Sequence, residues 1–380
     1  MTYNYRTTRG AFKLGTVRKN ILNNEYVPLP RVFLQDNDIG HYQSTSDTKL
    51  QRLNIGTETN VFAPSIDGTI PYWSSGRSCK THALWSGGNP SGGSSPGSKS
   101  SAQKLTYASY TVEEAPAANS PLGRSWMTSM ASEDNAYFTA GYAAGEPVAG
   151  RTDSYKISFS TDTCTALPST TLNDGGVQWQ MVSLTNGNDA GYAFGGIWSV
   201  NPGGSRCFKL TYATDGMARL PGSNTVWNPS QTNRNPEYSR ANMMSTTAGY
   251  QSGGESFPGS DASSMTTKLT FSGESWSVVP GAYLPEVREK STSGTGSRGK
   301  AWYGGGQGAS AAAVSNFTLL DFSAETWTAV PGMNHPGPSG SGSDSANSST
   351  SPRDSLKGAD KASKGYDGGK GKRWYDDAAS

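Results

Sequence analysis

One pattern of apolar and polar positions recurs along most of the chain. In six segments an aliphatic residue is followed two positions later by a large apolar residue, and nine positions after that by a proline. The aliphatic residues are Leu53, Leu105, Ile157, Leu210, Leu269 and Leu320. The prolines are Pro64, Pro116, Pro168, Pro221, Pro280 and Pro331, at intervals of 52, 52, 53, 59 and 51 residues. Six matches in register indicate an internal repeat.

Each segment predicts a β-hairpin. Apolar residues two positions apart lie on one face of a strand. The small and acidic residues that follow favour a turn, and the proline is expected to end the second strand because it has no N–H to donate. Another strand, ending in glycine, is predicted upstream of five hairpins, as in 136–145 and 190–196, and the first hairpin has the weaker segment 38–44. Segments such as 124–132 and 177–184 predict a fourth strand. Four antiparallel strands per repeat predict an all-β fold, a six-bladed β-propeller over residues 26–333.

The same residues resemble kelch repeats, in which a strand ends in Gly-Gly, the next strand carries an aromatic residue, and a Trp follows the turn. The fifth and sixth segments carry this pattern in Gly253-Gly254, Phe271 and Trp276, and in 303–306, Phe322 and Trp327. The other four segments hold Asn60, Val112, Cys164 and Met217 at the Trp position, so the set is divergent.

The amino-acid sequence of residues 135–168 as a whole is similar to the kelch-type repeats of virion proteins from marine tailed phages, cyanophages especially. The resemblance covers residues 26–333 and implies a non-enzymatic structural protein of a tail, fibre or other external appendage. Such a protein acts in assembly or host attachment, is made in the host cytoplasm, and joins other virion proteins in a symmetric assembly.

Two segments lie outside the predicted propeller. Residues 1–25 form a basic N-terminal arm, expected either to pack along one blade or to order against a neighbouring subunit. Its basic residues, with no acidic residue before Glu25, are Arg6, Arg9, Lys13, Arg18 and Lys19. Residues 334–380 begin as a Gly/Ser-rich linker and end as a charged tail, predicted to be flexible. Trp374 and Tyr375 in that tail are candidate anchors for docking.

Composition narrows the function further. The 380 residues include 47 glycines, and only 16% are charged. The net charge is +2, which does not indicate nucleic-acid binding. No apolar run is long enough to span a membrane, and the first residues lack the apolar stretch of a secretory signal. The three cysteines, Cys79, Cys164 and Cys207, are too few and too far apart to predict a disulfide framework or a zinc site.

No catalytic, metal or cofactor site is predicted. The three histidines, His41, His82 and His335, stand in separate parts of the chain, so we interpret His41 and His82 as ordinary polar neighbours of strands rather than copper ligands. Segments 272–276 and 323–327 lack the Asp and Gly of a sialidase Asp box. Acidic residues recur in the hairpin turns, at Glu58, Asp162, Asp215, Glu274 and Glu325. Because these positions lie around a ring, we interpret them as turn formers rather than as a paired-carboxylate site.

The alternative to a structural role is a lectin-like propeller that recognises host surface glycans. Aromatic residues near or between the predicted strands are candidates for stacking on sugars. They are Tyr72, Trp73, Trp85, Trp198 and Trp227.

Overall fold

A computed structural model of the chain describes most of the repeats. The described residues are 39–43, 50–54, 59–62, 74–79, 81–89, 98–106, 109, 111–143, 151–168, 172, 178–179, 181–186, 189–195, 197–198, 207–220, 235–238, 241–245, 247–257, 261–289, 292–295, 299–304, 307–308, 316–334 and 348–350. The basic arm, Trp374 and Tyr375 lie outside them.

The described chain is built from antiparallel sheets, five of which have four strands. The first contains β29 (Ser348–Thr350), β1 (Ile39–Gln43), β2 (Leu50–Asn54) and β3 (Thr59–Phe62). The second contains β4 (Ser75–Ser78), β5 (His82–Ser86), β6 (Ala102–Thr106) and β7 (Thr111–Glu114). The third contains β8 (Thr128–Ala131), β9 (Asn135–Thr139), β10 (Ser154–Ser158) and β11 (Cys164–Leu167).

The fourth contains β13 (Val182–Asn186), β14 (Ala190–Phe194), β16 (Cys207–Thr211) and β17 (Gly216–Arg219). Another contains β24 (Thr292–Thr295), β25 (Lys300–Gly304), β27 (Asn316–Asp321) and β28 (Thr326–Asn334). Between these two lies a seven-stranded sheet with β19 (Ala241–Met244), β20 (Ala248–Ser252), β22 (Asp261–Thr270) and β23 (Ser275–Glu289). Its other strands are β18 (Asn235–Tyr238), β21 (Glu255–Phe257) and β26 (Gln307–Gly308). A two-stranded pair joins β12 (Gln178–Trp179) to β15 (Ile197–Trp198).

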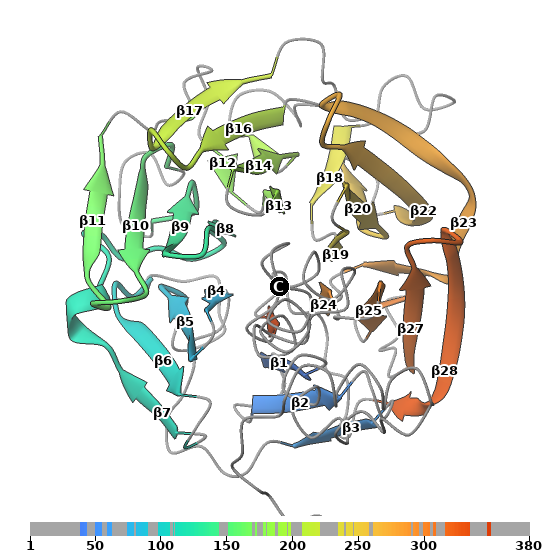
Figure 1. The fold of residues 1–380 in the computed structure, drawn as a ribbon, viewed down its shortest axis with the longest axis horizontal. Helices are drawn as coiled ribbons and strands as arrows, with labels where there is room; N and C mark the ends of the chain where they lie inside the picture. The colour runs from blue at the N-terminus through green and yellow to red at the C-terminus, as the bar shows by residue number, and fades with distance from the viewer. Residues whose placement is uncertain are drawn as a thin grey trace, which may run out of the picture.

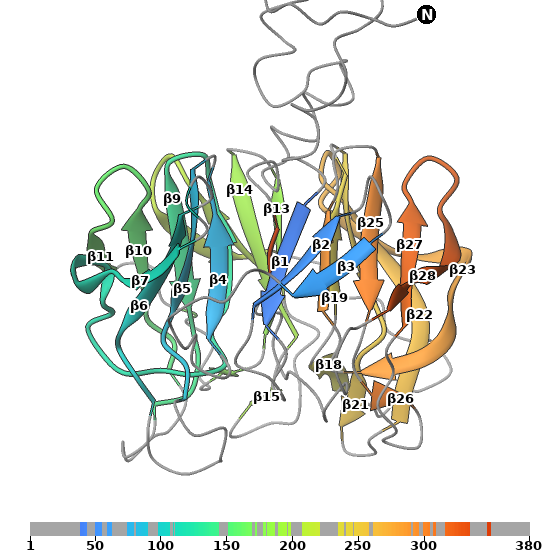
Figure 2. The ribbon, with the colours of Figure 1, turned by 90° about the horizontal axis from the view of Figure 1, so that it is seen from below.

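These sheets surround a common axis, so the expected all-β propeller is confirmed (Figure 1). The strands nearest the axis lie next to one another in the order β4, β8, β13, β19, β24 and β29, and β29 lies beside β4. Seen from the side, the β10–β11 and β27–β28 turns point to one face, and β15, β18, β21 and β26 lie toward the other (Figure 2). No described helix is long and apolar enough to cross a membrane.

The first sheet joins the two ends of the described chain. β29 pairs with β1 through Gly40–Thr350, His41–Ser349 and Tyr42–Ser348. Residues 348–350 belong to the segment expected from composition to be a linker, yet they supply the innermost strand of this sheet. The pairing joins the last part of the chain to the first, and this closes the ring.

The repeated hairpins have the predicted pairing. In each, the aliphatic residue lies opposite the residue at the Trp position of the kelch pattern, as in Leu269–Trp276 and Leu320–Trp327. Ile157 lies opposite Cys164 in the same way, so the thiol occupies a position that an indole fills elsewhere. The remaining pairs are Leu53–Asn60, Leu105–Val112 and Leu210–Met217.

The expectation that proline ends the second strand holds for β7 and β11 but is wrong for β23 and β28, which continue past Pro280 and Pro331. In β23 the register shifts between the pairs Thr267–Val278 and Met265–Tyr283, so Pro280 lies in an irregular stretch of the ladder. In β28 it shifts between Phe317–Val330 and Asn316–Asn334. A proline at such a bulge leaves no ladder bond unmade, so the strand continues.

Hydrophobic clusters lie between neighbouring sheets. One joins Leu84 of β5 to Phe138 of β9 and Ile157 of β10, and another joins Phe194 of β14 to Leu269 of β22 and Trp276 of β23. The third, fourth and seven-stranded sheets each contribute to a cluster on either side, so these sheets are stabilised by stacking rather than singly.

A glycine after β5 allows close packing between two sheets. Gly87 has φ +70°, and a Cβ there would lie 2.3 Å from the carbonyl oxygen of Arg124. Only glycine fits this combination of left-handed backbone and close approach.

Candidate functional site

The recurring acidic residues bind side chains of the preceding sheet. The Lys Nζ to carboxylate oxygen distances are 2.6 Å for Lys156–Asp215, 2.5 Å for Lys209–Glu274 and 2.6 Å for Lys268–Glu325. In each pair the lysine stands on the third strand of one sheet and the acid in the hairpin turn of the next. The carboxylates therefore join separate sheets instead of meeting in one place.

A tyrosine hydroxyl donates to each of the same carboxylates. Its oxygen lies 3.0 Å from Asp215 for Tyr137, 3.1 Å from Glu274 for Tyr192, and 2.8 Å from Glu325 for Tyr250. We call each set of lysine, acid and aromatic donor a latch. The latches are Lys156–Asp215–Tyr137, Lys209–Glu274–Tyr192 and Lys268–Glu325–Tyr250, and a fourth, with histidine as the donor, is described below.

Strand register places the lysine and tyrosine of each latch together. Tyr137 lies opposite Lys156, Tyr192 opposite Lys209, and Tyr250 opposite Lys268. Both side chains therefore leave the same face of the sheet and reach one acceptor. Burial, followed by the nearby carboxylate, raises the pKa of each of these three phenols, so they remain protonated donors.

The tyrosine ring also packs against the next repeat. Tyr137 stacks on Tyr212 at 4.9 Å between ring centroids, Tyr192 on Phe271 at 5.7 Å, and Tyr250 on Phe322 at 5.1 Å. The second ring of each pair is the large apolar residue two positions after the repeated aliphatic residue. Each seam thus combines an aromatic contact with a charged one.

The latch acids adopt a backbone conformation that is rare for their residue types. Their φ angles are +52° for Asp162, Asp215 and Glu325, and +46° for Glu274. A residue with a Cβ is disfavoured there, and Glu more than Asn or Asp. The left-handed backbone of the turn directs the carboxylate toward the preceding sheet. The bonds that it accepts there offset the conformational cost.

The latch between the second and third sheets has a histidine in place of the tyrosine. Lys104 Nζ lies 2.6 Å from Asp162 Oδ2, and His82 Nε2 lies 3.0 Å from Asp162 Oδ1. The residue opposite Lys104 is the apolar Leu84, and His82 stands two positions earlier on β5, opposite Thr106. The donor is therefore supplied from the adjacent position on the same face of the strand. His82 is 3% exposed and meets Phe159 edge-on at 5.7 Å.

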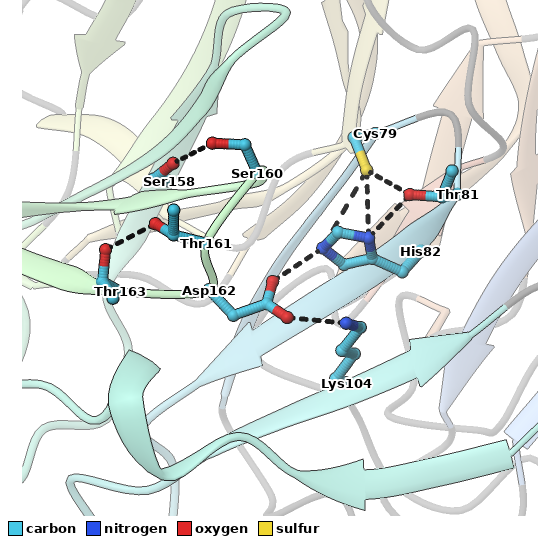
Figure 3. A network of polar contacts seen from close by, with 9 residues as sticks. All are labelled: Cys79, Thr81, His82, Lys104, Ser158, Ser160, Thr161, Asp162 and Thr163. Carbon is cyan, nitrogen blue, oxygen red and sulfur yellow. Dashed lines mark hydrogen bonds and ion pairs between the residues drawn. The ribbon is translucent and has the colours of Figure 1, made fainter.

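His82 also contacts a cysteine (Figure 3). Cys79, in the turn between β4 and β5, has its Sγ 3.2 Å from His82 Nδ1. Thr81 Oγ1 lies 2.9 Å from the same nitrogen and 3.4 Å from the sulfur. The imidazole therefore connects a thiol on one side to a carboxylate on the other.

The cysteines of this seam have opposite electrostatic environments. Burial by itself would raise the pKa of Cys79, but the hydrogen bonds from His82 and Thr81 outweigh it and hold the pKa below its ordinary value. Burial raises the pKa of Cys164 to about 11. Both side chains pack against the same hydrophobic cluster, and Cys79, Cys164 and Cys207 are all free thiols.

Near the axis, Arg77 of β4 bonds to two neighbouring sheets. Its guanidinium donates to the carbonyl oxygen of Ser129 on β8 and, at 2.9 Å, to Ser183 Oγ on β13. Ser183 Oγ in turn lies 2.5 Å from the Ser129 carbonyl oxygen. This network joins three sheets at their inner strands.

Most of the side chains proposed for glycan stacking lie outside the described residues. Trp85 is fully buried on β5, where its indole lies against Gly76, so its ring is not exposed to a ligand. Trp198 is on β15, but its side chain, like Tyr72, Trp73 and Trp227, lies outside the described residues.

Sequence reasoning found the latch acids but missed their partners. The interpretation of Asp162 and its equivalents as turn formers is incomplete, because each also binds across a seam. The interpretation of His82 as a polar neighbour of a strand is also incomplete, because it stands on β5 and its ring lies between Cys79 and Asp162. One signal was present, because lysine stands immediately before the aliphatic residue at 104, 156, 209 and 268.

Among the described residues, no group of three or more His, Cys, Asp or Glu side chains is arranged to hold a metal ion. No known protein-family model matches this chain, and a search of curated proteins finds no match.

Proposed function

We propose that this chain is a non-enzymatic structural protein of a virion, a kelch-like propeller in a tail, fibre or other external appendage. It acts in assembly or host attachment, together with other virion proteins. The viral assignment rests on the resemblance of the repeat sequence, and the structural role rests on the latches.

The structural role is supported by one observation, that the recurring acidic residues join neighbouring sheets. At four successive seams the acid of the repeat is paired with a lysine of the preceding sheet. At three of them it also accepts a hydrogen bond from a tyrosine, and at the fourth it lies at ion-pair distance from His82. Carboxylates held singly around a ring do not form the close pair that glycoside hydrolysis needs. They do stiffen the ring against bending, which suits a protein that must present a fixed surface.

In this proposal the propeller has six blades, with the seven-stranded sheet as one of them. Its strands β19, β20, β22 and β23 pair in the same order as the four strands of the other sheets. The additional strands β18, β21 and β26 extend that blade at one face (Figure 2).

The basic arm is the proposed means of attachment. Residues 1–24 contain five basic residues and no acidic one, so the remainder of the chain carries a net charge of about −3. An arm of opposite charge favours contact with a neighbouring subunit or with a more acidic protein.

Deletion of residues 1–24 tests this proposal. All six repeated hairpins remain, so we expect the truncated chain to fold and melt like the full chain. We also expect it to be lost from purified particles, as measured by mass spectrometry and immunogold electron microscopy. A matched control keeps the arm length and changes only its charge, by Arg6→Gln, Arg9→Gln, Lys13→Gln, Arg18→Gln and Lys19→Gln.

Two results would contradict the proposal. If the full chain is abundant in infected cells but absent from purified particles, it is not a virion protein. If the truncated chain fails to fold, the arm belongs to the ring itself, and attachment must use another surface.

A further inference from the structure

We propose that Cys79 is a reactive, modifiable thiol that exchanges with low-molecular-weight disulfides, with His82 as its base and Asp162 as the positioning residue. His82 and Asp162 belong to a latch, and Cys79 lies next to His82 but has no part in the structural proposal. The side chains of all three lie together at the seam between the second and third sheets (Figure 3).

Asp162 sets the state of the imidazole. Its Oδ1 lies 3.0 Å from Nε2 of His82, an ion-pair distance at which the N–H is not aligned for a hydrogen bond. The negative charge of the carboxylate favours the neutral ring with its proton on Nε2. Nδ1 is then left with a lone pair, directed at Cys79 Sγ 3.2 Å away. Lys104 binds the other oxygen of Asp162 at 2.6 Å and fixes the orientation of the carboxylate.

The thiolate has two donors once it forms. When the thiol proton passes to Nδ1, the imidazolium is paired with Asp162 on one side and with the sulfur on the other. The Thr81 hydroxyl, 3.4 Å from the sulfur, provides a second hydrogen bond. Cys79 is partly exposed in a hairpin turn, while His82 is 3% exposed, so the cysteine is the more accessible of the two to a reagent in solvent.

The Cys79 thiolate attacks one sulfur of a small disulfide, a new S–S bond forms, and the original S–S bond of the reagent breaks. The departing sulfur leaves with the electron pair of the broken bond and takes up the proton held by His82. Cys79 is thereby oxidised to a mixed disulfide, and half of the reagent is reduced to a thiol.

The other two cysteines are internal controls. Cys207 is buried on β16, and Cys164 is in the same hydrophobic cluster as Cys79, where burial raises its pKa and no described histidine contacts it. We therefore expect selective reaction in the native full chain, without removing any cysteine.

The experiment treats the full chain with glutathione disulfide at about pH 7 and follows each cysteine by peptide mass spectrometry. We expect Cys79 to react at least about tenfold faster than Cys164, because rate follows thiolate fraction. His82→Gln is expected to slow Cys79 by about tenfold, and Asp162→Asn by about threefold. Asp215→Asn, which breaks a latch of the same kind two sheets away from this thiol, is the matched control and is expected to leave the Cys79 rate unchanged.

A pH series separates activation from simple exposure. The ratio of the Cys79 rate to the Cys164 rate should be high and constant below the pKa of Cys79 and should fall above it, since Cys164 ionises only toward pH 11. This measurement needs no variant, so it holds even if His82→Gln does not fold. A ratio that does not fall between neutral pH and the pKa of Cys164, equal rates for the two thiols at neutral pH, or an unchanged rate in folded His82→Gln would each overturn the proposal.

Discussion

At the scale of single residues, the latch acids have two structural roles. Each occupies the left-handed position of a hairpin turn and also accepts bonds from a lysine and an aromatic donor of the preceding sheet. Asparagine tolerates the same backbone conformation. Replacing Asp by Asn therefore removes the charge and keeps the turn.

We predict that Asp215→Asn lowers the free energy of unfolding by about 1–2 kcal/mol, since the Lys156 ion pair and part of the Tyr137 bond are lost from a half-buried site. Urea unfolding at neutral pH measures the change. Glu113→Gln, at an exposed position of β7, is the control and should be neutral. Equal effects of the two substitutions would mean that the latch contributes nothing beyond surface charge.

Acid should weaken the latch of Glu325. The hydrogen bond from Lys268 holds the pKa of this carboxyl below its ordinary value of 4.5. A depressed folded-state pKa stabilises the protein above pH 4.5, and this contribution disappears as pH falls through the folded-state value.

The matched variant is Glu325→Gln, which cannot titrate. We predict that the full chain is more stable than Glu325→Gln at neutral pH and that the difference shrinks toward zero as pH falls below 4.5 and through the folded-state pKa. Denaturant midpoints at a series of pH values give this difference. A gap that stays constant with pH would show that Glu325 carries no linked charge.

At the scale of elements, small residues on the second strand of a sheet allow the neighbouring sheet to pack close to it. Gly191 of β14 lies opposite Leu210, and a Cβ there would meet Met130 Sδ at 2.5 Å and Tyr212 Oη at 2.7 Å. Gly249 of β20 lies against Leu184 of β13 in the same manner. These glycines set how closely adjacent sheets approach.

We predict that Gly191→Ala costs about 1–3 kcal/mol of stability, because the added methyl group forces Met130 and Tyr212 apart in a packed interface. Gly273→Ala is the control, since a Cβ there has only an ordinary contact of 3.4 Å with Ser275 Oγ. Thermal melting compares the two. A neutral Gly191→Ala would show that the seam accommodates the methyl group.

At the scale of the whole molecule, closure depends on a strand from outside the repeats. β29 pairs with β1 and lies between β24 and β4, so it joins the last sheet to the second as well as completing the first. A ring closed by pairing of its two chain ends resists opening more than a linear stack, because each end strand otherwise presents an unpaired edge.

We predict that ending the chain at residue 334 lowers the unfolding free energy by about 2–4 kcal/mol and exposes the β1 amides to hydrogen exchange. Ending it at residue 350 keeps β29 and should leave both properties as in the full chain. If the two truncations behave alike, β29 does not close the ring.

The sequence by itself determined the local elements. The apolar spacing around Ile157 and Leu210 places these residues on the buried face of a strand because side chains alternate with a period of two. The glycines, the acidic turn residues and the register with the Trp position follow from local sterics and turn chemistry, which act within a few residues. For that reason the all-β propeller was predictable.

Only the tertiary structure decided which polar residues meet. Lys156 and Asp215 are 59 positions apart, and His82 and Asp162 are 80 apart, so no local pattern brings them together. The continuation of β23 past Pro280 and the recruitment of β29 likewise depend on partners distant in the chain. Contacts of this kind are fixed by how neighbouring sheets stack, because side chains from different repeats become neighbours only when the ring closes.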